Sequence, residues 1–314
     1  MTEKWTSADI PDQAGRSVIV TGANSGLGLV TARELARRGA SVTLAVRDTA
    51  KGEHAATAIR EAEPSAEVDV KPLDLADLDS VRGFAASRAD AQLDLLVNNA
   101  GVMALPRSTT KDGFEMQFGT NHLGHFALAG LLMPALEKGT EPRVVTLSSG
   151  AHRIGKVNFD DLQGERRYFR WAAYGQSKLA NLLFAFELQR RAAAAGLDLK
   201  SMAAHPGYAA TNLQTRGSGG HGGLLTRVED GLMAVTNKVL AQSDEMGALP
   251  TLYAATVPDL PGGSFVGPDG VGEQRGHPEP VDSNAASKDR AAARRLWEVS
   301  EQLTGVSFDL VTAR

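Results

Sequence analysis

Short apolar runs alternate with longer amphipathic segments along most of the chain. The runs are rich in β-branched residues and apolar at almost every position, which is typical of strands buried on both faces of a parallel sheet. The expected strands cover 17–22, 41–46, 67–73, 93–99, 143–149 and 199–205.

The segments between these runs place their apolar residues at helical spacing. The expected helices cover 26–38, 49–62, 77–88, 113–137 and 172–195, and a terminal amphipathic helix over 287–305 should end at Gly305. This alternation predicts an α/β fold with a Rossmann-type, doubly wound parallel sheet and helices on both faces. We expect a single domain over 1–314, with its core at about 15–268 and a C-terminal extension at 269–314.

The pattern changes after residue 205. The stretch TRGSGGHGGLL at 215–225 is too rich in glycine for regular structure, so it is either a mobile loop or a plain surface linker. Further helices are expected near 226–256.

Composition narrows the class of protein. The 314 residues are 42% apolar and 22% charged, which favours a well-filled globular core. A net charge of -4 gives no electrostatic case for nucleic acid or an anionic membrane as partner. The chain has no cysteine, which excludes disulfides, thiol catalysis and cysteine-ligated zinc. With a polar N-terminus and no apolar run long enough for a membrane span, we expect a cytoplasmic protein.

A glycine-rich turn follows the first expected strand. In TGANSGLG, Gly22, Gly26 and Gly28 have the spacing G-x-x-x-G-x-G and open the first helix. Glycines allow close backbone approach, and the helix N-terminus offers N–H groups to a pyrophosphate. A ligand-free strand-to-helix turn is the alternative, but the context favours dinucleotide binding.

The stretch YGQSK places Tyr174 and Lys178 one turn apart on the same face of a helix. Such a pair can be an ordinary aromatic–cation contact. Reduction of a carbonyl by a nicotinamide leaves an alkoxide that needs a proton, and a nearby ammonium stabilises the phenolate that remains. Tyr174 is therefore the candidate acid/base, with a pKa expected to be lowered by Lys178 together with the nearby cationic nicotinamide ring.

The glycine spacing resembles that of the short-chain dehydrogenase/reductase family. Further motifs of that family occur in order, and the resemblance covers about 20–305. They are Asp74–Leu75, NNAG at 98–101, Asn121, Ser148–Ser149, YGQSK, and HPG at 205–207 with Thr211. The resemblance implies that the cofactor is bound by Gly22, Asn24, Ser25, Gly26, Leu27, Gly28, Arg47, Asp74, Leu75, Asn99, Ala100, Gly101, Tyr174, Lys178, Pro206, Gly207 and Thr211.

The same resemblance assigns catalytic roles to Asn121, Ser149, Tyr174 and Lys178. Lys178 would also bind the nicotinamide ribose, Asn121 would hold a water in a proton relay, and Ser149 would orient the substrate carbonyl. Ser149 is preferred to Ser148 because the family's serine is usually the last of this doublet.

Two segments resemble the retinol dehydrogenase-type branch of the family. They are RDTAKGE at 47–53 and SSGAHRIGKVNFDDLQGERRYFRWAAYGQSKLAN at 148–181. The N-terminal membrane helix of many members is not seen here, so a soluble member is expected, and retinoid or other lipid substrates are not implied.

Cofactor choice depends on the end of the second strand. Val46 stands where relatives that prefer NAD usually carry an acid, and Arg47 follows it. A guanidinium suits a 2′-phosphate, which predicts NADP(H), although Arg47 could also be a solvated surface residue. Asp48 is expected to cap the next helix.

The two histidines His122 and His125 are three residues apart on an expected helix, a spacing that can bind metal. No carboxylate or cysteine motif supports them, so packing or solvent contact is favoured, and no metal site is predicted.

We therefore expect an NADP(H)-dependent oxidoreductase that transfers hydride between nicotinamide and a carbonyl or a primary or secondary alcohol. Trp171, Tyr208 and several leucines favour a fairly apolar small-molecule substrate. The alternatives are a C=C reductase of the same fold, which typically relies on a cysteine, and a dinucleotide sensor without turnover, which typically lacks the tyrosine or the lysine. By resemblance, 113–137 and 172–195 would form the faces of a homodimer or homotetramer, with the alternative that the C-terminal extension covers another interface.

Overall fold

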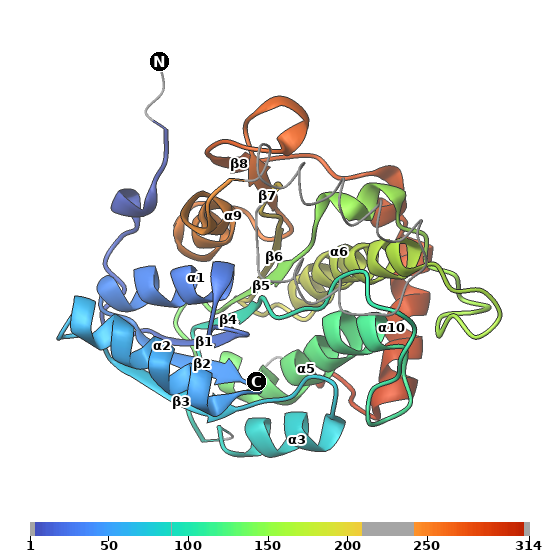
Figure 1. Ribbon diagram of the computed structural model, residues 1–314, viewed down its shortest axis with the longest axis horizontal. Coiled ribbons are helices and arrows are strands. Elements are labelled where there is room, and N and C mark those ends of the chain that lie inside the picture. Colours follow the sequence, from blue (N-terminus) through green and yellow to red (C-terminus); the bar gives the residue numbers. More distant parts are fainter. Residues whose placement is uncertain (1–3, 89, 209–241, 311–314) are drawn as a thin grey trace, which may run out of the picture.

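Within the described residues, 4–88, 90–208 and 242–310, the computed structural model contains one sheet of eight strands (Figure 1). The strands are β1 (Ser17–Thr21), β2 (Ser41–Val46), β3 (Val68–Pro72), β4 (Leu95–Asn98), β5 (Arg143–Leu147), β6 (Lys200–Ala204), β7 (Phe265–Pro268) and β8 (Pro278–Pro280). Their order is β3-β2-β1-β4-β5-β6-β7-β8, and every neighbouring pair is parallel except β7 and β8.

The helices of the described part lie on both sides of this sheet. The longer ones are α1 (Gly26–Arg37), α2 (Thr49–Ala62), α3 (Leu78–Ala86), α5 (Gly124–Leu136), α6 (Arg170–Ala194), α9 (Asp244–Thr256) and α10 (Arg290–Thr304). Short turns are η1 (Ser7–Asp9), α4 (Met116–Phe118), the π-helical η2 (Gly119–Leu123), η3 (Gly150–Ile154), η4 (Val271–Glu273) and η5 (Ala285–Lys288).

Alternation along the strands divides the core into two layers. In β1, Val18 and Val20 pack with α1, α2 and α9 on one face, whereas Ile19 packs with α3, α5 and α6 on the other. Because both faces are covered, the central strands are apolar at successive positions, as the sequence pattern indicated. The predicted Rossmann-type fold is confirmed.

The main differences from the expected elements lie near the C-terminus. The strands β7 and β8 were not predicted, because they are only four and three residues long and contain Pro268, Pro278 and Pro280. The last helix starts later than expected, at Arg290, where the Asp289 side chain caps it, and it ends at Gly305 in the left-handed conformation with φ 66°. The glycine-rich stretch at 215–225 lies outside the described residues.

The expected helix at 113–137 is interrupted. Regular structure begins at Met116, where Glu115 caps the first turn, and the π-helical η2 separates α4 from α5. A π-turn of this kind is often found at a functional site, and η2 contains Asn121.

Candidate active site

The family motifs lie where parallel strands end. The glycine loop follows β1, NNAG completes β4, the serine doublet follows β5 and HPG follows β6. Carboxyl ends of parallel strands share one edge of a sheet, which is where ligands bind in open α/β folds.

The glycine loop is packed tightly against the NNAG segment. Gly22 has φ +67°, and a Cβ there would stand 2.9 Å from Cβ of Ala100. A Cβ on Gly28 would lie 2.7 Å from the carbonyl oxygen of Gly22 and would collide with the Asn99 amide. Gly22 and Gly28 are therefore required by the packing of the chain on itself.

Gly26 differs from these two glycines. Its φ is +57°, and a Cβ there would have only Oδ2 of Asp244 nearby, at 3.8 Å. The side chain of Ser25, at the N-cap of α1, makes no capping hydrogen bond, so the first N–H groups of the helix are left for another acceptor. An open glycine beside an uncapped helix N-terminus fits a pyrophosphate, with Asn24, Ser25, Gly26 and Leu27 on the approach.

Thr21 joins the glycine loop to the NNAG segment. Its Oγ1 accepts the N–H groups of Asn99 and Ala100, both at 2.9 Å, and its carbonyl oxygen accepts the Asn99 side-chain amide at 2.7 Å. No local sequence pattern indicates this role of Thr21, because the partners are 78 and 79 residues away.

The Asp74–Leu75 pair follows β3. Oδ1 of Asp74 accepts the N–H of Ala76 at 3.0 Å, and the backbone N–H of Asp74 donates to Oγ of Ser80 at 2.9 Å. Leu75 packs against Gly124, where a Cβ would stand 3.0 Å from that of Leu75. The pair thus shapes the turn between β3 and α3.

Tyr174 and Lys178 lie one turn apart on α6, and both are buried. Nζ of Lys178 is 5.8 Å from the centre of the Tyr174 ring and donates to the carbonyl oxygen of Leu147 at 3.2 Å. The Ser149 and Tyr174 side chains share a hydrogen bond. Oγ of Ser148 instead donates to the backbone carbonyl of Lys178 at 2.9 Å. The structure therefore brings Ser149 to the tyrosine hydroxyl and engages Ser148 elsewhere.

Burial controls the charges of this pair. It raises the pKa of Tyr174 to about 12, against a lowering by the Ser149 hydrogen bond, and it lowers the pKa of Lys178 to about 8. The direction for Tyr174 is opposite to the one expected from the sequence, because loss of solvent disfavours the phenolate more than the surroundings stabilise it. The Tyr174 hydroxyl therefore keeps its proton at neutral pH.

The side chain of Asn121, in η2, is held by three hydrogen bonds to two residues. Its Oδ1 accepts the N–H of Val102 at 2.8 Å, and its Nδ2 donates to the Val102 carbonyl and to Oγ of Ser177, both at 2.9 Å. Gly101 faces this side chain, since a Cβ there would lie 3.1 Å from Oδ1 of Asn121 and 3.6 Å from Nζ of Lys178. The motif residues Gly101, Asn121 and Lys178 thus meet at one place.

The two histidines of this region have separate partners. His125 lies between Oγ1 of Thr21 and the carbonyl oxygen of Asn121, each at 2.9 Å, whereas Nε2 of His122 is 2.9 Å from Oγ of Ser300. Both rings are buried, in agreement with the expected packing role. Among the described residues, no group of His, Cys, Asp and Glu could hold a metal ion.

The end of β2 matches part of the expectation. Asp48 caps α2 by accepting the N–H of Lys51 at 3.1 Å and forms an ion pair with the Lys51 side chain at 2.8 Å, as predicted. Arg47 is exposed. Val46 is buried, and its side chain packs closely against Gly52: a Cβ on Gly52 would lie only 2.7 Å from Cγ2 of Val46.

The HPG turn after β6 is held by residues before α9 and between β7 and β8. Gly207 has φ +66°, Gln242 donates to the carbonyl of Pro206 at 2.6 Å, and Nε2 of His205 is 2.9 Å from the Glu273 carboxylate. Glu273 was not anticipated as a residue of this region. Thr211 lies outside the described residues.

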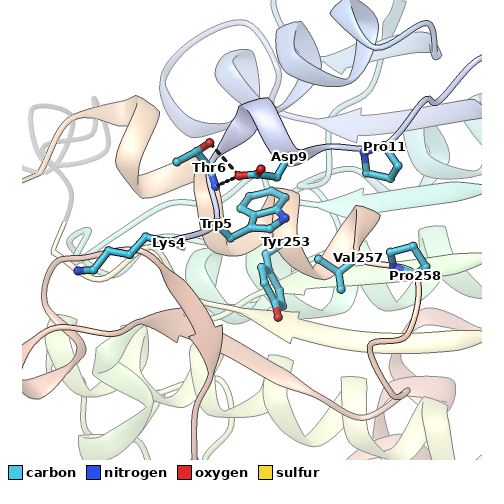
Figure 2. A pocket seen from close by; sticks show the side chains of 8 residues that line it. All are labelled: Lys4, Trp5, Thr6, Asp9, Pro11, Tyr253, Val257 and Pro258. Atoms are coloured by element: carbon cyan, nitrogen blue, oxygen red, sulfur yellow. Dashed lines mark hydrogen bonds between the residues drawn. The ribbon is translucent and has the colours of Figure 1, made fainter. Parts of the chain in front are cut away.

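One surface hollow of about 490 Å³ lies apart from these residues (Figure 2). It lies between the N-terminal arm and α9, and Trp5 and Tyr253 meet edge to face across it at 5.3 Å. None of the predicted site residues lines it.

Comparison with known proteins identifies the class. Residues 16–219 match the short chain dehydrogenase family, and the chain belongs to that family. It is 43% identical to retinol dehydrogenase 13 of Homo sapiens over 304 residues, which is 96% of this chain and 87% of that protein. It is 41% identical to polyprenol dehydrogenase of Mus musculus, covering 94% and 86% of the two chains. The expected retinol dehydrogenase-like branch is confirmed.

Two solved structures extend the comparison. An uncharacterized protein from Mycobacterium paratuberculosis is 50% identical, has a TM-score of 0.80, and covers 98% of this chain and 99% of its own. A protein from Beutenbergia cavernae described as an NAD(P) dependent gluconate 5-dehydrogenase, with bound NADP, is 25% identical with a TM-score of 0.59, and the match covers 78% and 91% of the chains. The protein is thus an oxidoreductase that binds a nicotinamide dinucleotide and acts on an alcohol or carbonyl.

The predicted cytoplasmic location is wrong. The relatives are named for retinol and polyprenol, which are apolar alcohols that partition into membranes, and they contradict a cytoplasmic assignment. Net charge and a polar N-terminus carry no information on the alcohols for which these relatives are named. In the part of the chain that the structure describes, no helix is long and apolar enough to cross a membrane.

Proposed function

We propose that the protein is an NADP(H)-dependent carbonyl reductase or alcohol dehydrogenase that uses Tyr174 as its acid/base. The observation that carries this proposal is the burial of Tyr174 and Lys178 one turn apart on α6, with Nζ of Lys178 5.8 Å from the centre of the Tyr174 ring and Ser149 beside the tyrosine. When bound, the nicotinamide supplies or accepts the hydride.

The residues of this chain have distinct parts in the reaction. Tyr174, whose pKa burial raises to about 12, keeps its proton at neutral pH and delivers it from Oη to the carbonyl oxygen. Ser149 orients that oxygen by a hydrogen bond and stabilises its developing charge. Lys178 holds a positive charge near the phenolate that forms. Asn121 fixes the turn at Gly101 and Val102, which lies beside the ammonium of Lys178.

NADP(H) is supported by Arg47. Its side chain is exposed directly after β2. The neighbouring Asp48 carboxylate forms an ion pair with Lys51, so it is already engaged and is not the acceptor expected for a ribose hydroxyl. The NADP bound to the relative from Beutenbergia cavernae also supports this choice.

A fairly apolar alcohol or aldehyde is the substrate class that we favour. Trp171 meets Tyr174 edge to face at 6.2 Å, which puts an aromatic surface beside the proton donor. The names of the retinol and polyprenol dehydrogenase relatives support the same class.

The test is a panel of apolar and polar aldehydes, ketones and alcohols, followed by the absorbance of NADPH. Wild-type protein should turn over at least one apolar member, and Tyr174→Phe should bind NADPH as before but lose about 10²–10⁴-fold in kcat. Substantial turnover by Tyr174→Phe would remove Tyr174 from the mechanism. Preference for NADH over NADPH would reject the cofactor assignment.

A further inference from the structure

A strained glutamate lies at the centre of a contact between three loops. Glu273 has φ +56°, a left-handed conformation that non-glycine residues rarely adopt, and it follows Gly272 at φ +65° in the turn between β7 and β8. Its side chain is partly buried, with 21% of it exposed. Strain of this kind persists only where the surroundings fix it, and it is concentrated at functional sites.

The first partner of the carboxylate is the HPG turn. His205 is buried at the end of β6, where its Nδ1 accepts the N–H of Gly207 at 3.2 Å. Its other nitrogen, Nε2, therefore carries the proton and donates to Oε2 of Glu273 at 2.9 Å. The same turn is held by the next residue along the loop, since the carbonyl oxygen of Gln274 accepts the N–H of Tyr208 at 2.8 Å.

The second partner is the short helix that begins at the active-site serine. Arg153 lies in η3 and donates from a guanidinium nitrogen to Oε1 of Glu273 at 2.6 Å. Ser149 is the N-cap of η3, and its Oγ accepts the N–H of Ala151 at 3.3 Å. The hydrogen bond from His205, and to a smaller extent that from Arg153, holds the pKa of Glu273 below its usual range. The carboxylate is therefore charged when it contacts both residues.

We infer that Glu273 is a positioning residue that fixes the Ser149 loop relative to the HPG turn through its contacts with Arg153 and His205. The inference rests on the proposed function, because Ser149 is given its role there and NADP(H) is proposed there as the cofactor. The Glu273 carboxylate contacts Arg153 and His205, one in each loop, so it acts on the site through the two loops. The backbone strain is then the cost of directing one carboxylate at both partners.

Four variants separate the effects. Glu273→Ala removes the carboxylate and keeps the unfavourable φ, whereas Glu273→Gly removes both the carboxylate and the strain. Arg153→Met breaks only the contact between Glu273 and η3. The Arg153 side chain is 47% exposed, so the fold should tolerate this substitution. Glu279→Gln, an exposed glutamate on β8, is the matched control.

The expected results differ between kinetics and stability. Glu273→Ala and Glu273→Gly should both lose about 10- to 100-fold in kcat, since small displacements of a positioning group are that costly. Glu273→Gly should nevertheless melt about 2–4 °C above Glu273→Ala. Arg153→Met should lower kcat and leave the NADPH dissociation constant unchanged, whereas the Glu273 variants should also weaken NADPH, because they free the turn at Gly207.

Hydrogen exchange of the ligand-free protein gives a readout that does not depend on turnover. The amides of Ala151 and Tyr208 should exchange faster in the Glu273 variants and as in wild type in Glu279→Gln. Wild-type kcat and wild-type exchange in Glu273→Ala would overturn the inference. If wild-type protein itself bound no NADPH and turned over no substrate, the proposed function would fail, while exchange and melting would still report whether Glu273 holds the two loops.

Discussion

Nε2 of His125 lies 2.9 Å from Oγ1 of Thr21, at the boundary between α5 and β1. Oγ1 also accepts two backbone N–H groups, and its own proton has two acceptors within reach, the ring nitrogen and, at 3.3 Å, the carbonyl oxygen of Val97. The opposite nitrogen, Nδ1, faces the carbonyl oxygen of Asn121 and must carry the proton there. His125 is therefore a neutral imidazole with one defined tautomer, and it connects the glycine loop to the turn that holds Asn121.

This arrangement predicts loss of stability in mild acid. Burial lowers the pKa of His125 to about 4 and that of His122 to about 3, whereas the unfolded chain has an ordinary value of 6.5. Between pH 6.5 and 4 the unfolded state binds more protons, so stability is complete above pH 6.5 and falls as the pH drops. The loss from His125 alone should reach about 3 kcal/mol.

The measurement is denaturant unfolding at intervals from pH 7 to pH 4.5. His125→Asn should be less stable at pH 7 but should show a shallower dependence on pH, because one buried imidazole has been removed. His54→Asn, an exposed histidine on α2, should leave the pH dependence as it is. An unchanged slope in His125→Asn would mean that the acid sensitivity comes from other groups.

Lys178 should set the pH dependence of carbonyl reduction. Its ammonium, with a pKa that burial lowers to about 8, is present below that pH and is lost above it. Tyr174, at about 12, stays protonated across the same range. We therefore expect kcat/KM to be flat up to about pH 8 and then to fall toward tenfold per pH unit. Lys178→Met should be slower at every pH and lack this descending limb. A limb that survives in Lys178→Met would belong to another group.

The fold was accessible from the sequence because its elements are long or strongly patterned. Strands such as β1 and β5 are apolar at successive positions, and α1 and α2 match their expected bounds to within a residue. The strands β7 and β8 are short, contain proline, and are stabilised by pairing rather than by a pattern of their own.

The site was only partly accessible. Glycine spacing and YGQSK mark Gly26, Tyr174 and Lys178 because each forms part of a local motif. The contacts of His125 with Thr21 and of Glu273 with Arg153 join residues 104 and 120 positions apart, and no local pattern records them. The raised pKa of Tyr174 likewise depends on burial, which spacing along a helix does not reveal.

Trp297 packs against two helices, α5 and α6, from the segments that the family resemblance assigned to subunit contacts. Its ring on α10 is 5.1 Å from that of Phe126 on α5 and 5.8 Å from that of Phe184 on α6, and it is 2% exposed. Trp297→Ala should cost about 3–5 kcal/mol in the free energy of unfolding, because a large ring leaves a cavity. Glu298→Ala, on the exposed side of the same helix, should cost little.

The same packing predicts the oligomeric state. With α10 seated on α5 and α6, these helices should not form the interface of a dimer, and sedimentation velocity should show no self-association that depends on them. Trp297→Ala, by exposing Phe126 and Phe184, should increase self-association. A stable wild-type dimer that is disrupted by substitutions on the outer surface of α5 or α6 would contradict this.

Cofactor preference should depend on Arg47. One charge-assisted hydrogen bond from its guanidinium to a 2′-phosphate is worth about 1.5–3 kcal/mol, which corresponds to roughly ten- to hundredfold in affinity. Solvent exposure at this position favours the lower figure. Arg47→Ala should weaken NADPH binding by that factor and leave NADH almost unchanged, as measured by calorimetric titration of both cofactors. Arg294→Ala, an exposed arginine on α10, is the control.

Replacing Val46 by the acid that NAD-preferring relatives usually carry at this position should not simply reverse the cofactor preference. Its side chain is buried against Gly52 of α2, so Val46→Asp would place a carboxylate in the core and should lower stability before it improves NADH binding. Thermal melting of Val46→Asp beside its NADH titration separates the two effects.

Two results would contradict the role given to Arg47. Equal losses of affinity for NADPH and for NADH in Arg47→Ala would make Arg47 a structural residue. Tighter binding of NADH than of NADPH by the wild-type protein would reverse the cofactor assignment.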